Sequence, residues 1–504
     1  MKPRTLNSRI SVKSPVFFTF VMMFATAFAM LTPVHAQVPL VKLSTDTFHN
    51  SDSQHRSEVE PDTYSWGSTI VSSFQVARVS GGGGADLGFA TSTDAGKTWK
   101  HGYLPGLTDN YKGGSFTAAS DAAVAYDAKH GQWLIASLPI VDDNGEAVGI
   151  SRSPDGITWG KPILVDHSGS DDKEWVICDN TTTSPHYGNC YVEWDEPALG
   201  DLIFMSTSTD GGKTWSAGKN TADGAGGLGG QPLVQPNGNV VVPIDGFGGM
   251  IAFSSTNGGK SWSNSLLIAN QNFRGEDGGL RSPGLPSAAI DKAGKIYLVW
   301  PDCSFHSGCS TDDIVMSTST NGTKWTAPIR IPIDPLKSPI DHFIPGIGVD
   351  LATSGKTAHV AITYYYYPNA SCNNSCQLNV GFTLSQDGGK TWTAGKKLAG
   401  PMQLSWLPNS QNGLMVADYL AIAYANGNPF GVFAVAQAPS GGVLNEAMYT
   451  TKNPLAASAT EPRFSSAGEK RVPDAMGRYV WKYYDDDGEY PIPPSQQNRL
   501  VKHK

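Results

Sequence analysis

A short turn motif recurs along the chain and limits what the chain can fold into. Full copies of the pattern Ser-x-Asp-x-Gly-Lys-Thr-Trp begin at Ser92, Ser208 and Ser385. Looser copies, with Asn in place of Asp or with one residue fewer, begin at Ser153, Ser255 and Ser319. Related turns that return along most of a chain are typical of a fold built from repeated units.

The residue types of this motif suit a tight hairpin turn. An Asp or Asn at the third position can accept hydrogen bonds from backbone N–H groups two residues on, and the Gly can adopt a positive φ. The Trp that ends the motif can anchor the turn by burying its ring between neighbouring sheets. Because the turn itself uses the hydrogen-bonding capacity of the aspartates, we interpret them as structural residues and not as catalytic acids.

Pairs of apolar runs before the turns predict the strands. Residues 122–127 and 133–137 form one such pair around a polar turn, and each copy of the motif is preceded by a similar pair. A seventh pair, 418–424 with 431–436, follows the last copy. The 56 glycines, 33 prolines and 13 tryptophans also favour short strands and tight turns over helices.

The motif resembles the Asp-box of the bacterial neuraminidase repeat, and its copies extend over nearly all of the chain after residue 36. Proteins with this repeat are β-propellers, so the resemblance implies an all-β fold with a single β-propeller over residues 37–460. The strand pairs predict seven blades, with six, the number in known sialidase propellers, as the alternative. The seventh unit lacks an outer strand, and we expect residues 39–44 to supply it and close the last blade. The polar residues 461–504 are predicted to form a C-terminal extension.

The N-terminus has the pattern of a signal peptide. Four basic residues precede an apolar run over residues 16–31, and a short segment leads to Ala36. We expect residues 1–36 to be cleaved and the protein to be secreted or periplasmic, without membrane insertion afterwards. An uncleaved anchor is the alternative, although a run of about 16 residues is shorter than the ~20 that span a bilayer. Cleavage leaves 33 basic residues (37 minus four) against 45 acidic ones, which argues against nucleic acid as a partner.

Six cysteines fall into three close pairs, Cys178 with Cys190, Cys303 with Cys309, and Cys372 with Cys376. In an exported protein such pairs predict local disulfides that each fasten one loop. A metal site is the alternative, but the chain has no C-x-x-C and no histidine pair at ligand spacing near these cysteines.

Charged residues gather in loops that, in a propeller, would surround the mouth of the central channel. Loops on a rigid scaffold often carry sites, and opposed carboxylates there can act as acid and base. Solvated or salt-bridged loops are the alternative. The resemblance to sialidases implies arginines that hold a substrate carboxylate, a tyrosine nucleophile activated by a glutamate, and an acid–base aspartate. By loop position, the candidate catalytic residues are Arg78, Asp121, Asp172, Glu174, Arg274, Glu276, Arg281 and Tyr419.

One triplet has the spelling of a sialidase motif in a different place. Sialidases carry an Arg-Ile-Pro segment before the first Asp-box, whereas Arg330-Ile331-Pro332 follows the fifth turn here and is predicted as an outer strand. We therefore do not assign Arg330 to the site.

These features predict an exported, monomeric, exo-sialidase-like glycoside hydrolase that acts on a glycan or glycoconjugate at the channel face. The alternative is a non-catalytic propeller that binds glycan or protein. The predicted activity requires no cofactor, and calcium binding by the acidic loops is an alternative that the sequence leaves open. We interpret the acidic run 485–489 as a solvated turn. Neither G-x-S-x-G nor H-E-x-x-H is present, and the G-x-G-x-x-G at 224–229 precedes strand-like residues and not a helix.

Overall fold

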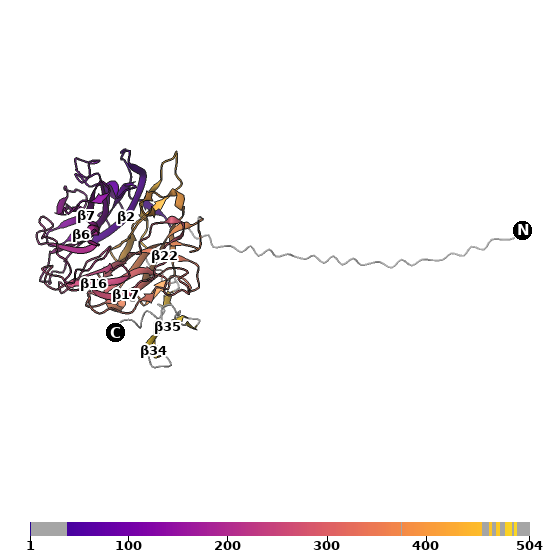
Figure 1. Ribbon diagram of the computed structural model, residues 1–504. Coiled ribbons are helices and arrows are strands. Elements are labelled where there is room, and N and C mark those ends of the chain that lie inside the picture. Colours follow the sequence, from indigo (N-terminus) through magenta and orange to yellow (C-terminus); the bar gives the residue numbers. More distant parts are fainter. Residues whose placement is uncertain are drawn as a thin grey trace. The chain divides into compact units, whose positions relative to one another are not determined.

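The structure is a computed structural model, and it describes residues 1, 38–373, 375–455, 463–465, 470–473, 479–485 and 488–490. Strands are the main regular structure of the described chain (Figure 1). The described residues also contain four 3-10 turns, at Pro197–Leu199, Asp277–Gly279, Gly355–Thr357 and Leu404–Trp406. The all-β prediction is therefore confirmed. The predicted signal peptide, apart from its first residue, lies outside the described residues. In the part of the chain that is described, no helix has the length and apolar character needed to cross a bilayer.

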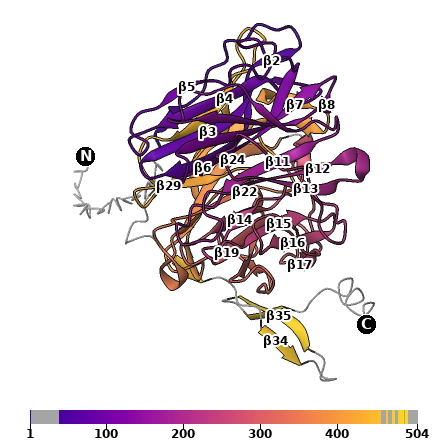
Figure 2. The same cartoon turned by 90° about the vertical axis from the view of Figure 1, so that its left-hand side faces the viewer.

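Antiparallel sheets follow one another along the chain, each built mainly from one stretch of sequence (Figure 2). The first sheet contains β2 (Ser53–Trp66), β3 (Thr69–Val79), β4 (Gly84–Ser92) and β5 (Lys100–Tyr103). The second contains β6 (Ala118–Asp127), β7 (Gln132–Val141), β8 (Asn144–Gly145), β9 (Val148–Ser153) and β10 (Ile163–Asp166). A single residue pair, Gly84 with Ala119, joins these two sheets through β4 and β6.

The next four sheets repeat the same meander. The third contains β11 (Asp172–Cys178), β12 (Cys190–Glu196) and β13 (Leu202–Ser208), and the fourth contains β14 (Leu233–Val234), β15 (Val240–Asp245), β16 (Gly249–Ser255) and β17 (Leu266–Asn270). The fifth contains β18 (Ser287–Ile290), β19 (Ile296–Asp302), β20 (Asp313–Ser319) and β21 (Ile329–Arg330). The sixth contains β22 (Asp341–Val349), β23 (Val360–Tyr367), β24 (Gln377–Ser385) and β26 (Lys396–Gln403).

The last unit joins the two ends of the described body. It consists of the pair β29 (Ile422–Ala425) and β30 (Asn428–Gly431), followed by β31 (Phe433–Ala436) and β32 (Glu446–Thr451). The N-terminal strand β1 (Leu40–Lys42) pairs antiparallel with β32, with Leu40 opposite Thr451. The pairing expected for residues 39–44 is thus present.

Four short pairings lie outside these meanders. The strands involved are β25 (Thr391–Thr393) with β33 (Arg463–Ser465), β27 (Asn409–Ser410) with β28 (Gly413–Leu414), and β34 (Lys470–Pro473), β35 (Tyr479–Asp485) and β36 (Gly488–Tyr490) in one small sheet. Asp485 pairs with Gly488 in the acidic run, and residues 486–487 of that run are outside the described residues.

The first strands of seven successive sheets form a closed series of neighbours. β2 packs beside β6, β6 beside β11, β11 beside β14, β14 beside β18, β18 beside β22, β22 beside β29, and β29 beside β2. Groups at the ends of these strands can therefore meet although they are far apart in sequence.

Apolar side chains fill the spaces between neighbouring sheets. Trp194 and Val176 of the third sheet pack with Leu134 of the second, for example, and Trp392 packs with Tyr297 and Ile347. Middle strands are covered on both faces, which explains why their sequences, such as Val240–Asp245, are buried along their whole length instead of alternating.

The repeated turns take the conformation that their sequence favours, with one difference in detail. In the first copy, Asp94 Oδ1 accepts from the backbone N–H of Thr98 at 2.9 Å, and Oδ2 accepts from the Thr98 hydroxyl at 2.6 Å. In this full copy, the Asp side chain thus accepts from a backbone N–H four residues on and not two as expected. In the shorter copy the donor is two residues on, where Ile157 N–H donates to Asp155 at 2.8 Å. These bonds from Thr98 lower the pKa of Asp94 to about 2. Gly96, at φ 82°, is required here because a Cβ would lie 2.3 Å from the ring of Phe430.

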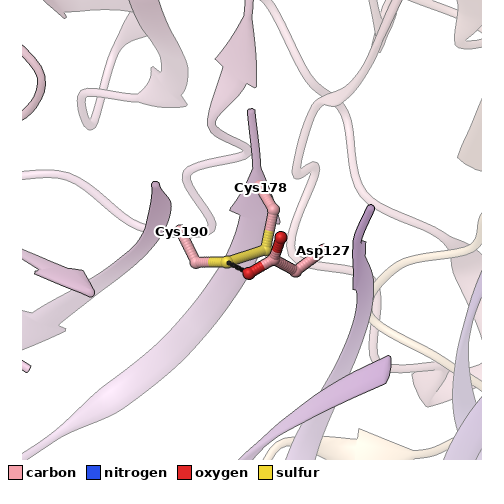
Figure 3. Close-up of side chains that lie close together, drawn as sticks. All are labelled: Asp127, Cys178 and Cys190. Carbon is pink, nitrogen blue, oxygen red and sulfur yellow. Dashed lines mark hydrogen bonds between the residues drawn. A yellow bond between two sulfur atoms is a disulfide. The ribbon is translucent and has the colours of Figure 1, made fainter. Parts of the chain in front are cut away.

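All three predicted disulfides are present, at Cys178–Cys190, Cys303–Cys309 and Cys372–Cys376. The first joins directly paired residues of β11 and β12. Asp127 lies beside this disulfide (Figure 3), with its Oδ2 3.7 Å from Cys190 Sγ. Since both sulfurs are bonded to each other, this group is not a metal site.

Candidate functional site

The same backbone irregularity occurs in the first strand of four sheets. The pairing register shifts twice along β2 and once along each of β6, β11 and β22. One residue at the second shift of β2, and one at the shift in each other strand, has a left-handed backbone. These residues are Glu60 (φ 54°), Asp121 (φ 51°), Lys173 (φ 52°) and Ile344 (φ 47°). A bulge re-aims its side chain, and a positive φ in a residue other than Gly is strained, a condition that is concentrated at functional sites.

Three of these bulged residues meet in one buried group, which we name the Lys173 cluster: Glu60, Asp121, Lys173, Arg281 and Asp418. Lys173 Nζ lies 2.8 Å from Asp121, 2.8 Å from Asp418 and 3.3 Å from Glu60. Arg281 also pairs with Asp418, through Nε at 2.8 Å and through Nη2.

Electrostatics divides the carboxylates of the Lys173 cluster into two kinds. Burial raises the pKa of Glu60 to about 8, although Lys173 counteracts part of the shift. Burial also acts against ionisation of Asp418, but Lys173 and Arg281 outweigh it and hold the pKa of that carboxyl far below its usual range. The cluster thus holds a proton on Glu60 and a negative charge on Asp418 near neutral pH.

A pocket opens beside the cluster. Its lining residues are Lys173, Glu174, Trp175, Gly229, Gln231, Leu285, Pro286 and Tyr419. The rings of Tyr419 and Trp175 meet edge to face at 5.1 Å, and the Tyr419 hydroxyl donates to the carbonyl of Ala122 at 3.3 Å.

Glu174 is the acid in this pocket. It is 1% exposed, and neither carboxylate oxygen has a hydrogen-bond partner among the described residues. Burial, followed by the nearby charge of Asp121, raises its pKa well above the ordinary value. Burial therefore favours the neutral form of this carboxyl group.

A second row of acids continues from the pocket along β12. Glu193 and Asp195 are fully buried and both lack partners for their carboxylate oxygens. Burial raises the pKa of Asp195 to about 10, and Asp172, its partner across the strands, adds to the shift. Burial and Asp121 raise the pKa of Asp172 itself to about 6.

The structure brings six of the eight sequence-predicted site residues to this region. Asp121 and Arg281 belong to the Lys173 cluster, and Glu174 and Tyr419 line the pocket. Asp172 precedes Lys173 in β11. Arg78 approaches through Gln75, to which its Nη1 donates at 3.0 Å and which in turn bonds Glu60.

Arg274 and Glu276 lie in a different group. Arg274 Nη1 contacts Asp341 at 2.7 Å and Nη2 contacts Asp277 at 3.5 Å. Burial, with Asp341 second, raises the pKa of Glu276 to about 8. Among the described residues, no hydrogen bond or ion pair joins Arg274 or Glu276 to the Lys173 cluster. Loop position had grouped Arg78, Arg274 and Arg281 together. In the structure Arg78 and Arg281 lie at the Lys173 cluster, and Arg274 lies in the second group.

Each of the predicted arginines is already held by the protein. Arg281 faces Asp418, Arg274 faces Asp341, and Arg78 donates to Gln75 and to the Gly83 carbonyl at 2.7 Å. Arg78 keeps one buried donor, Nε, without a partner. A substrate carboxylate would have to use that donor or share Arg281 with Asp418.

Sequence reasoning missed the central cation. Lys173 stands between Asp172 and Glu174, two residues that were selected by loop position, and nothing in the sequence marks the bulge that turns it inward. Loop position placed Glu60 and Asp418 among the charged residues of the channel face, but neither was chosen as a candidate catalytic residue. Glu60 lies inside a strand, where period-two alternation would have assigned it to one face without the register shift.

Two further groups have the spacing of metal ligands. Asp313, Asp334 and His342 are close together, but Arg330 already pairs with Asp313 at 2.8 Å and with Asp334 at 2.5 Å. Arg330 is thus a buried ion-pair residue at the edge strand β21, in agreement with its exclusion from the site. The other group, Asp166 with Asp171 and Glu196, has no such compensation.

Comparison with known proteins gives one local sequence match. No protein-family model matches the chain. A sialidase of Bacteroides fragilis (strain YCH46) is 29% identical over 157 residues, which cover 27% of this chain and 27% of the sialidase. The chain therefore spans about a quarter of the length of this curated relative.

Similar solved structures include several glycan-related proteins. A Hadza microbial sialidase is 17% identical with a TM-score of 0.41, over 70% of this chain and 68% of that one. The NanB sialidase of Streptococcus pneumoniae is 14% identical with a TM-score of 0.39, over 82% and 70%. A polysaccharide lyase acting on ulvan is 12% identical with a TM-score of 0.48, over 81% and 95%.

The repeated turns and the local match make this chain similar to sialidases with bacterial neuraminidase repeats, and its described fold is all-β. Its three disulfides fit an extracellular or periplasmic protein.

Proposed function

We propose that the protein is an exported glycoside hydrolase of the sialidase-like type, which cleaves a glycan in the pocket at Glu174 and Tyr419. The observation that carries this proposal is the position of Glu174, a neutral, unpartnered acid that lines a pocket next to the charged Lys173 cluster. A general acid in glycoside hydrolysis needs both properties, because it must hold a proton at neutral pH and give it to the leaving oxygen.

We assign roles from this geometry. Glu174 donates its proton to the glycosidic oxygen, and Tyr419, which also lines the pocket, is the candidate nucleophile. Burial raises the pKa of Tyr419, and the nearby Glu60 and Asp121 add to the shift. Because Glu60 already holds a proton, Asp121 is the candidate base for the phenol proton. Arg281 and Arg78 are the candidate contacts for an acidic sugar.

We propose further that the sheets are the blades of one seven-bladed propeller over residues 37–460. Support comes from the closed series of first strands and from the pairing of β1 with β32, which covers the edge of the last sheet. Residues 1–36 are proposed as the signal peptide, residues 461–504 as a C-terminal extension, and the exported chain as a monomer without a required cofactor.

Hydrolysis of fluorogenic glycosides, a sialoside first among them, tests the proposed activity. We expect Glu174→Gln to lower kcat/KM at least about 100-fold, because a general acid contributes about 10²–10⁴-fold. Glu146→Gln is the matched control, since Glu146 lies outside the pocket and contacts His167. Equal turnover by wild-type protein and Glu174→Gln would remove Glu174 from the mechanism.

A non-catalytic glycan-binding protein is the second candidate. The pairing of every predicted arginine with a protein group favours it, because a binding protein does not need arginines free to hold the transition state. Binding of the same sugars by calorimetry, together with absent turnover across the whole glycoside panel, would support this candidate over hydrolysis.

A further inference from the structure

We infer that Asp166, Asp171 and Glu196 form a calcium site next to the candidate active site. One oxygen of each carboxylate lies within 4.8 Å of the others. Two oxygens bound to one Ca²⁺ at about 2.3–2.6 Å are at most about 5 Å apart, so one ion can contact all three. The three residues come from the end of β10, the residue before β11, and the end of β12.

Asp171 is the observation that points to a ligand. The residue is 2% exposed, and its Oδ2 has no hydrogen-bond partner, while Oδ1 accepts from the Ser168 hydroxyl at 3.1 Å. Oδ2 of Asp166 is also buried without a partner. A buried carboxylate oxygen without a partner is costly. A cation bound here would remove that cost for Oδ2 of Asp171 and Oδ2 of Asp166.

The protein supplies no cation of its own at this place. Among the described residues, no Lys or Arg forms an ion pair with the three carboxylates, and His167 is bound instead to Glu146 at 2.8 Å. Burial, then the charge of Asp166, raises the pKa of Asp171 to about 7. Two other acidic groups differ in this respect. The Lys173 cluster contains Lys173, and the group of Asp313 and Asp334 contains Arg330, so each has a basic side chain among its carboxylates.

The donor set selects the kind of ion. All candidate ligands are oxygens, from three carboxylates with the Ser168 hydroxyl beside them, and no cysteine or histidine belongs to the group. Oxygen-only sets suit hard cations, and Ca²⁺ accepts irregular arrangements that Mg²⁺ does not. The chain directly after Asp171 is β11, so a bound ion would fix the start of the strand that carries Lys173 and Glu174.

Calorimetric titration with CaCl₂, after removal of metal with EGTA and dialysis, tests this site on the exported chain. We expect one saturable site and a higher Tm in calcium than in EGTA. Asp171→Asn and Glu196→Gln should each weaken calcium binding at least about tenfold. Glu146→Gln, a neighbouring carboxylate outside the group, should bind calcium as wild-type protein does.

Tm values measured in calcium and in EGTA distinguish a calcium site from a group of carboxyls that is stabilised only by protonation. Asp171→Asn removes one of three crowded negative charges, so in EGTA we expect its Tm to exceed that of wild-type protein. In calcium the order should reverse, because wild-type protein binds the ion more tightly and is stabilised more by it. Absence of calcium heat in wild-type protein, or heat that both variants retain unchanged, would overturn the proposal, whatever the protein does to glycans.

Discussion

Lys173 shows how one residue can decide the character of a site. A single ammonium, 6% exposed, lies among three carboxylates and is the only group that contacts Glu60, Asp121 and Asp418 together in the described structure. Its pKa is raised well above the ordinary value, since Asp121 and Asp418, followed by Glu60, outweigh the effect of burial. The positive charge is thus fixed, and the carboxylates depend on it.

We expect Lys173→Met to destabilise the protein by about 3–5 kcal/mol, because removing one member of a buried charge group leaves the others uncompensated. Urea unfolding at neutral pH measures the difference. Lys97→Met is the control, as Lys97 is exposed in a repeated turn. Equal stability of Lys173→Met and Lys97→Met would mean that the carboxylates are not charged in the folded protein.

At the scale of single elements, two features matter: the bulges in the first strands and the contacts of the N-terminal segment. Equivalent bulges in β2, β6 and β11 turn Glu60, Asp121 and Lys173 to the same place, while the fourth bulge, in β22, presents Ile344. The second feature joins the N-terminal segment to β2 and β32. Ser44 donates to Glu58 at 2.7 Å and accepts from the backbone N–H of Met448 at 2.8 Å.

The N-terminal contact is expected to be sensitive to pH. Burial raises the pKa of Glu58 from 4.5 to about 7. Because the folded state binds this proton more tightly than the unfolded state, the unfolding free energy should fall as pH rises from about 4.5 to about 7, by up to roughly 3 kcal/mol. Glu446 lacks hydrogen-bond partners among the described residues, and burial, followed by Glu58, raises its pKa. The titration of Glu446 therefore also lowers the unfolding free energy as pH rises.

Glu58→Gln removes the titrating group, so its stability relative to wild-type protein should increase between pH 5 and pH 8. Urea midpoints at both pH values measure this change. Glu146→Gln serves as the comparison. If the variant and wild-type protein lose stability in parallel between the two pH values, Glu58 is not the group that titrates.

For the whole molecule, the pairing of β1 with β32 carries the main structural consequence. β1 supplies the outer partner of β32, and the adjacent Leu43 is 1% exposed within the apolar core. A sheet edge that is paired in this way is protected from association with other chains.

A chain that begins at residue 45 should be less stable than one that begins at residue 37. The shorter chain loses β1, Ser44 and the buried Leu43, and the last of these alone is worth about 1.5–3 kcal/mol. Urea midpoints and the fraction of aggregated protein measure the effect. Indistinguishable midpoints would show that the N-terminal strand contributes nothing to closure.

The sequence by itself determined the repeated local structure of this protein. The turn motif specifies its own hydrogen bonds, since Asp94 and Thr98 are only four residues apart, and the close cysteine pairs can meet without help from the rest of the fold. Apolar runs predicted the strands and the unpaired outer position that β1 occupies, because these features depend on periodicity along a short stretch.

Only the tertiary structure decided which charged residues meet. Loop position selected Glu174 and Tyr419, which do share a pocket, but it also selected Arg274, which pairs with Asp341 in another group. It omitted Lys173, whose direction follows from a bulge in β11. The register shift, the left-handed backbone and the neighbouring strand are set by contacts between sheets far apart in sequence, and these contacts leave no local pattern in the chain.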